Sequence, residues 1–341
     1  MTALGASPAP EGTTSRASAA SLQRVQASVR EGLEEVTGEM WRAVATDAPL
    51  VSRMSAHLMA MRGKMFRPTL VLLSSAVEDR PEPSAITFAA AVELIHLATL
   101  VHDDAIDHSV LRRGMPTLNS LFSNQISVIM GDFLYSTALT QLVGVGNLSA
   151  LRVLTRASTD MTIGELRQLA VTSPLGFSED EYYVLIRSKT ASLISAACEI
   201  GALCGAREQR RTLARFGEQL GMAFQITDDL IDYTEAATTT GKPSGIDLRE
   251  HKVTLPLIAA LRAMSPEERQ SVESLFAADA PDDRAIADVI GIVAGNGGLD
   301  FARKAAARYA AKAEQTLDAL PETVARTALL ESISYVMERH A

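Results

Sequence analysis

Two short acidic motifs inside apolar segments constrain this chain more than any other feature. VHDDAID covers residues 101–107, and TDDLID covers residues 227–232. On an α-helix, residues three and four apart share one face, so Asp103 and Asp107 would project together, and the second motif repeats this geometry. Like charges at this spacing destabilise a bare helix. A fold that contains both motifs therefore needs a cation to offset their charge.

The chemistry of clustered carboxylates points to a site for magnesium and phosphate. Carboxylate oxygens are hard ligands that suit Mg²⁺, which is commonly shared between one or two carboxylates and the phosphates of a substrate. One such motif on its own would be read as a solvated helix end. Both motifs here follow apolar residues, LATLV before the first and AFQI before the second. This context favours metal binding over simple solvation.

The rest of the chain predicts helices arranged in one domain. Hydrophobic residues make up 47% of the 341 residues and aromatic residues only 5%, a composition that favours helices over a β-sandwich. Apolar residues recur at helical spacing from about residue 21 to the end, and the breaks fall where Gly, Pro and Asn gather. We expect a disordered tail at residues 1–20 and one all-α domain of ten or more helices at residues 21–341. We expect neither strands nor a linker between two halves.

Charge and cysteine content limit the partners and the location. The formal net charge of −9 argues against general nucleic-acid binding, which requires a basic surface, although local cations can still hold a small anion. Cys198 and Cys204 lie in a helical segment and are expected to be buried thiols, which fits a cytoplasmic protein. We expect no membrane-spanning segment, because the most apolar run, about residues 84–102, contains Glu93 and His96.

Basic residues close to the two motifs are candidates for binding phosphate groups. Lys64 and Arg67 stand at the start of a predicted helix, a position that favours anions. Lys189 lies in an otherwise apolar helix and would need an anionic partner there. The remaining candidates follow the acidic motifs: Arg112, Arg113, Lys242 and Lys252. Taken singly, each of these residues is more often a solvated surface charge, so their interpretation depends on the whole pattern.

The order and spacing of the motifs resemble those of a known family. Between about residues 45 and 260 the chain contains, in order, GKMFRP, ELIH, HDDAID, RRGMPT, GDFLY, SKTASL, FQITDDLID and GKPSGIDLREHKVTLP. Together these motifs resemble the trans-isoprenyl diphosphate synthases, and the chain looks most like the long-chain members that make precursors of quinone side chains. Arg62, Met65 and His251 depart from the residues usual in that family, which puts the affinity for isopentenyl diphosphate in question. The resemblance implies one helical bundle with a central substrate cavity and an Mg²⁺-dependent prenyltransferase.

The resemblance also implies a role for each candidate residue. An allylic diphosphate would bind through Mg²⁺ between the motifs, ionise to an allylic cation and be attacked by isopentenyl diphosphate, which lengthens the chain. The residues implied for metal binding are Asp103, Asp107 and Asp228, with Asp104 and Asp232 acting through water or a neighbouring ligand. Those implied for the allylic diphosphate are Lys189, Lys242, Arg112 and Lys252, and those facing the cation are Thr190 and Gln225. Those implied for isopentenyl diphosphate are Lys64, Arg67, His96 and Arg113.

Residues before the first motif bear on the length of the product. In the family that the chain resembles, side chains one turn before the first aspartate line the floor of the tunnel for the growing product, and a bulky aromatic residue stops growth early. Thr99 and Ala98 are both small, which favours a long product over a farnesyl or geranylgeranyl product. Ile129, Phe133 and Leu134 are candidates for a deeper floor, although they could equally be ordinary core residues.

Two alternatives to a self-sufficient synthase remain. A terpene cyclase would share the fold, but it usually has an Asn/Ser/Glu-type metal motif where this chain has DDLID, and it needs no site for isopentenyl diphosphate. A subunit of a heteromeric synthase is the other alternative, and the two intact motifs favour its catalytic subunit over a regulatory one. We expect a homodimer, as the family resemblance implies, and only transient contact with a membrane when an apolar product leaves.

Overall fold

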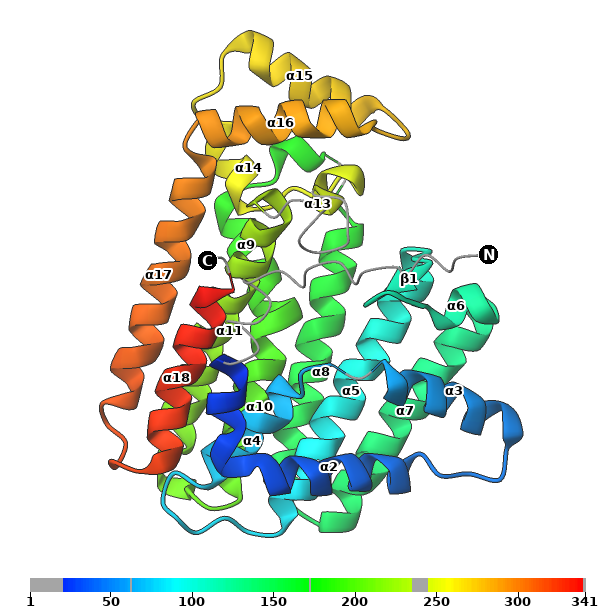
Figure 1. Cartoon of the computed structure of the whole chain (residues 1–341), viewed down its shortest axis with the longest axis vertical. Helices are drawn as coiled ribbons and strands as arrows, with labels where there is room; N and C mark the ends of the chain where they lie inside the picture. Colours follow the sequence, from blue (N-terminus) through cyan, green and yellow to red (C-terminus); the bar gives the residue numbers. More distant parts are fainter. Residues whose placement is uncertain (1–20, 62, 172, 235–244, 340–341) are drawn as a thin grey trace, which may run out of the picture.

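The computed structural model describes residues 21–61, 63–171, 173–234 and 245–339 of the chain. The tail predicted at residues 1–20 lies outside the described residues, as does Lys242. Nearly all of the described chain is helical, and its long helices run side by side along the longest axis of the molecule (Figure 1). The prediction of an all-α fold with ten or more helices is confirmed.

The helices alternate between long members of the bundle and short connecting turns. In chain order the first half contains η1 (Ala27–Val29), α2 (Arg30–Ala43), α3 (Pro49–Ala60), α4 (Phe66–Ser75), α5 (Ser84–Ile106), α6 (Leu118–Leu121), α7 (Asn124–Val145) and α8 (Leu148–Leu169). The second half contains η2 (Pro174–Gly176), α9 (Glu179–Ile186), η3 (Arg187–Ala191), α10 (Ser192–Leu203), η4 (Arg207–Gln209), α11 (Arg210–Thr234), α13 (Ile246–Arg249), α14 (Leu255–Ala260), α15 (Pro266–Ala277), α16 (Asp283–Gly295), α17 (Gly298–Leu317) and α18 (Val324–Glu338).

The two acidic motifs lie on different halves of the bundle, and α4 and α10 join these halves. One cluster of buried apolar side chains gathers around α11, α14, α17 and α18, and a second gathers around α2, α5, α7 and α8. The two central helices α4 and α10 contribute side chains to both clusters. Their close packing depends on Gly201, because a Cβ atom there would lie 2.3 Å from the carbonyl oxygen of Val71. This packing fixes the relative positions of α5 and α11, which carry the motifs.

The helix that carries the first motif, α5, is buried for most of its length. Ala89, Ala90 and Ala91 have no exposed surface, and these small side chains let neighbouring helices approach α5 closely. By length and composition alone, α5 and α7 are each apolar enough to cross a membrane, and α16 with α17 would qualify as one bent pair. This differs from the expectation of no such segment. In α5, 67% of the apolar window is buried inside the bundle, against 28% in α7.

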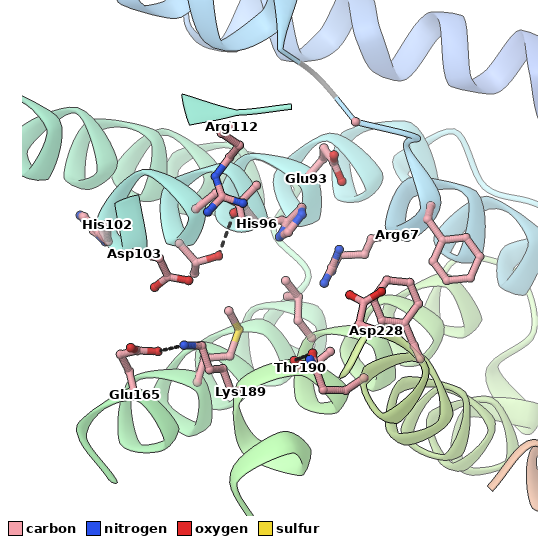
Figure 2. A pocket seen from close by; sticks show the side chains of 18 of the residues that line it. Arg67, Glu93, His96, His102, Asp103, Arg112, Glu165, Lys189, Thr190 and Asp228 are labelled. Carbon is pink, nitrogen blue, oxygen red and sulfur yellow. Dashed lines mark hydrogen bonds and ion pairs between the residues drawn. The ribbon is translucent and has the colours of Figure 1, made fainter. Parts of the chain in front are cut away.

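A short hairpin corrects the expectation that the chain has no strands. Residues Leu111–Arg112 form β1 and residues Met115–Pro116 form β2, and the two strands pair antiparallel. Arg113 and Gly114, between them, have φ angles of 53° and 76°, as a tight two-residue hairpin turn of the right twist requires. Sequence reasoning treated RRGMPT as a loop because each strand has only two residues. The hairpin stands directly after α5 and carries Arg112 toward the first motif (Figure 2).

Candidate active site

One cavity, of about 1000 Å³, collects most of the predicted site residues. Side chains from α4, α5, α7, α8, α10, α11 and α18 line it. The predicted residues among its lining are Lys64, Arg67, His96, Thr99, Asp103, Arg112, Arg113, Lys189, Thr190, Gln225 and Asp228. Figure 2 shows acidic and basic side chains from opposite walls pointing toward the same space. Asp104, Asp107, Asp232 and Lys252 do not line the cavity, although Asp104 pairs with Arg112, which does.

The first acidic motif, at the C-terminal end of α5, presents one carboxylate to the cavity. Asp103 lines the cavity, and burial raises the pKa of its carboxyl group to about 6. Asp104 is buried, and both its carboxylate oxygens accept a hydrogen bond from Nε of Arg112 at 2.9 Å. Asp107 stands at the end of the helix, where Nζ of Lys252 donates to it at 3.3 Å. The second and third aspartates of this motif are therefore held by cationic side chains.

The second acidic motif, on α11, also presents its first carboxylate to the cavity. Asp228 lines the cavity, and Nη2 of Arg339 lies 2.8 Å from its Oδ1. Arg339 follows α18 and stacks over the ring of Phe224, with 4.6 Å between the guanidinium carbon and the ring centre. The carboxylate of Asp232 accepts two backbone N–H groups at the start of α13, each at 2.9 Å. It thereby fastens the segment that leads to Lys252.

Lys189 and Thr190 reach the cavity from an irregular turn in a long helix. The five residues of η3 form a π-helical turn between α9 and α10. Such turns displace side chains from the regular helical face and occur often at functional sites. Nζ of Lys189 lies 2.5 Å from Oε2 of Glu165 and 3.1 Å from Oε1 of Gln168, both on α8 (Figure 2). The hydroxyl of Thr190 donates to Oε1 of Gln225 at 2.7 Å.

The second aspartate of the second motif is held without a cation among its hydrogen-bond partners. Asp229 is buried, and its two carboxylate oxygens accept hydrogen bonds from the hydroxyl of Tyr182 at 2.5 Å and from Nε2 of Gln225 at 2.8 Å. Burial raises the pKa of its carboxyl group to about 7, although both hydrogen bonds oppose that rise. Asp229 does not line the cavity and is linked to it by its hydrogen bond with Gln225.

Four ionisable side chains gather at the end of the cavity near α4. Burial lowers the pKa of Arg67, whose Nε is buried with no hydrogen-bond partner among the described residues. Burial likewise raises the pKa of Glu93, whose Oε2 also has no hydrogen-bond partner there. Burial, with Arg67 and Arg113 close by, lowers the pKa of His96 well below its usual value, so the ring is neutral at pH 7. This end of the cavity therefore offers a buried donor on Arg67 and a buried acceptor on Glu93.

The residues predicted to set product length are scattered relative to the cavity. Thr99 lines the cavity, whereas Ala98, next to it on α5, is buried in the core. Leu134 has no exposed surface, and Phe133 packs against the same core cluster. Ile129 is 67% exposed, because α7 turns this side chain outward. Within one chain only Thr99 of this group touches the cavity, and the roles of the others stay predictions.

Several cavity residues were missed by sequence reasoning. Glu93 lies three residues before His96, and Glu165 lies three before Gln168, so their helical spacing was a usable signal. Tyr335 and Arg339 gave no signal, because only the folded chain brings the end of α18 against α11. The two cysteines are both free and buried, as expected.

Comparison with known proteins agrees with this arrangement. The family model described as polyprenyl synthetase matches residues 48–293. The all-trans-nonaprenyl-diphosphate synthase (geranyl-diphosphate specific) of Rhodobacter capsulatus is 38% identical over 87% of this chain and 91% of its own length. The heptaprenyl diphosphate synthase component 2 of Geobacillus stearothermophilus is 35% identical over 93% of this chain and 99% of its own.

The fold has equally close counterparts among solved structures. The polyprenyl synthase of Caulobacter crescentus CB15, solved in complex with calcium and isoprenyl diphosphate, superposes with a TM-score of 0.88 and 32% identity. The match covers 98% of this chain and all of that one. These full-length likenesses confirm the predicted fold and the predicted class of enzyme, a prenyltransferase. The chain belongs to the polyprenyl synthetase family.

Proposed function

We propose that this protein is a long-chain trans-polyprenyl diphosphate synthase, which joins isopentenyl diphosphate to an allylic diphosphate and repeats the step. The observation that carries the proposal is the pairing of Asp103 and Asp228 in one cavity with a surrounding set of cations. Carboxylates alone would repel a diphosphate, and cations alone would not ionise it. Their combination suits a metal-assisted departure of pyrophosphate.

The donor set of the cavity fits Mg²⁺ as the cofactor. No group of three His, Cys, Asp or Glu side chains is close enough to form a metal site within the described part of the chain. Asp103 and Asp228 offer carboxylate oxygens to the cavity. Burial has the largest effect in raising the pKa of the Asp103 carboxyl, and Asp107 is near enough for its charge to raise that pKa further. Mg²⁺ usually binds one or two carboxylates and takes its other ligands from water and substrate phosphates, so an incomplete protein site is what it requires. Bound there, Mg²⁺ would supply charge neutralisation for the departing pyrophosphate.

The allylic diphosphate would be held by cationic side chains around the acidic walls. Lys189 projects into the cavity between α8 and α11, and Arg112 lines it from the hairpin. Lys252 bridges from the segment after the second motif to Asp107 in the first. Burial opposes charge on Lys252, but its hydrogen bond to Glu250 and the nearby Asp107 raise the pKa of its ammonium group, so it stays charged.

Isopentenyl diphosphate would bind at the end of the cavity near α4. Lys64, Arg67 and Arg113 supply positive charge there. The buried Nε of Arg67 has no hydrogen-bond partner among the described residues and can donate to a phosphate oxygen. His96 is neutral and can donate one hydrogen bond to a phosphate oxygen without adding charge. The allylic cation would form between the two substrates, where Thr190 and Gln225 present oxygens to the cavity. Attack of the double bond, followed by loss of a proton to the released pyrophosphate, completes one elongation.

The small side chain of Thr99 supports a long product over a farnesyl or geranylgeranyl product. Thr99 lines the cavity one turn before Asp103, where a ring would block the path of a growing tail. We expect Thr99→Phe and Ala98→Phe to shorten the product to about farnesyl or geranylgeranyl length, measured by chromatography of the dephosphorylated products. Thr99→Val has a similar volume and should keep the long product. An unchanged product from both phenylalanine variants would remove the basis for the length assignment.

A second copy of the chain is the partner that the surface of α7 favours. Val128, Ile129 and Val143 are exposed apolar side chains on this helix. Exposed apolar area of this kind marks an interaction surface. We infer a homodimer that covers α7, with the catalytic subunit of a heteromeric synthase as the alternative. Light scattering on the purified protein measures its mass, and an elongation assay without any other subunit distinguishes the alternatives, since a self-sufficient dimer will be active alone.

The test of the proposed function is elongation by the purified protein. It is incubated with Mg²⁺, farnesyl diphosphate and labelled isopentenyl diphosphate, and a sample with EDTA is the control. A dominant product of heptaprenyl length or longer, lost with EDTA, is the expected result. A farnesyl or geranylgeranyl product would keep the reaction and overturn the length. Release of pyrophosphate without elongation would overturn the synthase in favour of a cyclase.

A further inference from the structure

A hydrogen-bonded chain of four side chains leads from the protein interior to the cavity. It begins at Tyr182 on α9, passes through Asp229 and Gln225 on α11, and ends at Thr190 on η3. The three donor–acceptor distances are 2.5, 2.8 and 2.7 Å. Tyr182 and Asp229 are buried, whereas Gln225 and Thr190 line the cavity. The chain therefore connects two buried groups, without an assigned role so far, to two groups that face the reacting atoms.

The donors and acceptors in this chain run in one direction. Asp229 accepts one hydrogen bond at each carboxylate oxygen, one from the hydroxyl of Tyr182 and one from the NH₂ group of Gln225. The amide oxygen is then left facing Thr190, whose hydroxyl donates to it. If the amide were reversed, its oxygen would meet a carboxylate oxygen in a buried site, which is strongly unfavourable. Asp229 thus decides which end of the amide faces the cavity.

Tyr182 stabilises the buried carboxyl group of Asp229 without a cationic partner. A buried carboxylate needs both oxygens satisfied, and a nearby cation is the usual solution. Here the phenol of Tyr182 satisfies one oxygen of Asp229 and the amide of Gln225 satisfies the other. The hydrogen-bonded chain therefore ends at the cavity with oxygen atoms and with no added positive charge.

We propose that Asp229 and Tyr182 are positioning residues that orient the oxygens of Gln225 and Thr190 toward the allylic cation. The hydroxyl of Thr190 donates its hydrogen bond to Gln225, so the lone pairs of the Thr190 oxygen are not used in that bond. Thr190 lines the cavity, and these lone pairs can therefore face it. Preset dipoles of this kind stabilise charge that develops in a transition state, because they need no reorganisation during the reaction. In this assignment Asp229 acts through an amide and is not a metal ligand, unlike its neighbour Asp228. The inference rests on the proposed function, since it requires an allylic cation in this cavity.

A purely structural role for the pair is the rival explanation. Tyr182 and Asp229 also join α9 to α11, and their loss could loosen the bundle. The two explanations differ in how the substitutions combine. A positioning residue that acts through Gln225 has nothing left to orient once that side chain is removed, whereas a structural effect persists.

The experiment is a double-mutant cycle measured by elongation kinetics. We expect Asp229→Asn to lower kcat by about ten- to a hundredfold, since removal of one directly acting dipole typically costs about a hundredfold or more. Tyr182→Phe, which keeps the ring, should lower kcat by about three- to tenfold. KM for both diphosphates and the Mg²⁺ concentration for half-maximal rate should change less than about threefold. In a Gln225→Ala background, Asp229→Asn should cost less than about twofold more.

Tyr183→Phe is the matched control. Tyr183 is the next residue on α9, but its hydroxyl contacts Arg308 on α17 and lies outside the hydrogen-bonded chain. It should keep kcat within about twofold of the unsubstituted protein. Losses from Asp229→Asn and Gln225→Ala that multiply in the double variant would overturn the inference, as would an Mg²⁺ requirement for Asp229→Asn that rises as steeply as for Asp228→Asn. A parent protein that does not elongate would overturn the proposed function as well, so the two failures are distinguishable.

Discussion

The two acidic motifs have nearly the same sequence, but their aspartates have different partners in the fold. In both motifs the first aspartate lines the cavity, Asp103 from α5 and Asp228 from α11. The second aspartate is held by a cation in the first motif, Arg112, and by neutral donors in the second. The third pairs with a lysine in the first motif and accepts backbone N–H groups in the second.

This difference separates what the motif determines from what its surroundings determine. The first position has the same place in both motifs, because Asp103 on α5 and Asp228 on α11 both line the cavity. Neighbouring segments then decide the task of the other positions. The hairpin after α5 brings Arg112 to the first motif, whereas α9 brings a phenol to the second. The predictions below test whether the likeness at the first position and the difference at the second extend to function and stability.

The largest expected effect concerns the likeness between the first aspartates. Asp103→Asn and Asp228→Asn should each lower kcat for elongation by about a thousandfold, because each removes a charge that a metal ion would require. The rate is measured over a titration of Mg²⁺, and both variants should need more of it. Asp132→Asn is the control, since this exposed carboxylate also lines the cavity but belongs to neither motif. A loss in only one of the two motif variants would contradict the symmetric role.

The next prediction concerns the pH dependence of folding stability. The pKa of Asp103 is about 6 in the folded protein, above its ordinary value of 3.8, so the folded state holds a proton that the unfolded state has already lost. The contribution of this group to stability is therefore full below about pH 4 and is lost as the pH rises through 6. In EDTA, Asp103→Asn should raise the free energy of unfolding by about 3 kcal/mol at pH 7.5 and by less than about 1 kcal/mol at pH 4.

Asp228→Asn is the comparison for that experiment. Arg339 lies against Asp228, so the substitution breaks an ion pair and should bring no gain at pH 7.5. Urea denaturation of the three proteins at both pH values measures the differences. Equal stabilisation by the two substitutions would show that Arg339 does not compensate the charge of Asp228.

The fold and the first aspartates could be predicted from the sequence because local rules govern them. Apolar spacing predicted the helices. The spacing within HDDAID predicted that Asp103 and Asp107 project together, whereas of these two Asp103 lines the cavity and Asp107 does not. The start of α4 between Lys64 and Arg67 was also correctly expected. The hairpin was missed because its strands have two residues each, too short for any periodic pattern.

Partners that come from distant segments could not be predicted in this way. Arg339 meets Asp228 across more than a hundred residues of sequence, and Lys252 meets Asp107 across a similar separation. Nothing in VMER or EHKV indicates these contacts, because tertiary packing alone creates them. The same is true of Tyr182, which reads as a core tyrosine until α11 is placed beside α9. For this reason the sequence predicted the chemical role of the motifs but did not predict which side chain contacts each carboxylate.

A third prediction tests the cation at the second position of the first motif. Asp104→Asn should lower the free energy of unfolding by about 2 kcal/mol, because it leaves the partly buried Arg112 without its charged acceptor. Asp107→Asn is the matched control within the same motif. Lys252, its partner, keeps the contact with Glu250, so the cost should be about 0.5 kcal/mol or less. Urea denaturation in EDTA measures both values. Equal costs would mean that the ion pair between Asp104 and Arg112 stabilises the fold no more than the pair between Asp107 and Lys252 does.

The smallest expected effect concerns the cation at the first position of the second motif. Nη2 of Arg339 lies 2.8 Å from Asp228, and the guanidinium group stacks on Phe224, so a metal ion must compete with it for the carboxylate. Arg339→Met should tighten the binding of Mn²⁺, used as a probe for Mg²⁺, by about fivefold in the substrate-free protein, which corresponds to a partly buried ion pair of about 1 kcal/mol. Electron paramagnetic resonance of unbound Mn²⁺ measures this affinity. Arg303→Met removes an exposed arginine paired with Asp300 on α17 and should leave the affinity unchanged. Weaker Mn²⁺ binding by Arg339→Met would show that Arg339 supports the metal site and does not compete with it, and the first positions of the two motifs would then differ as much as the second.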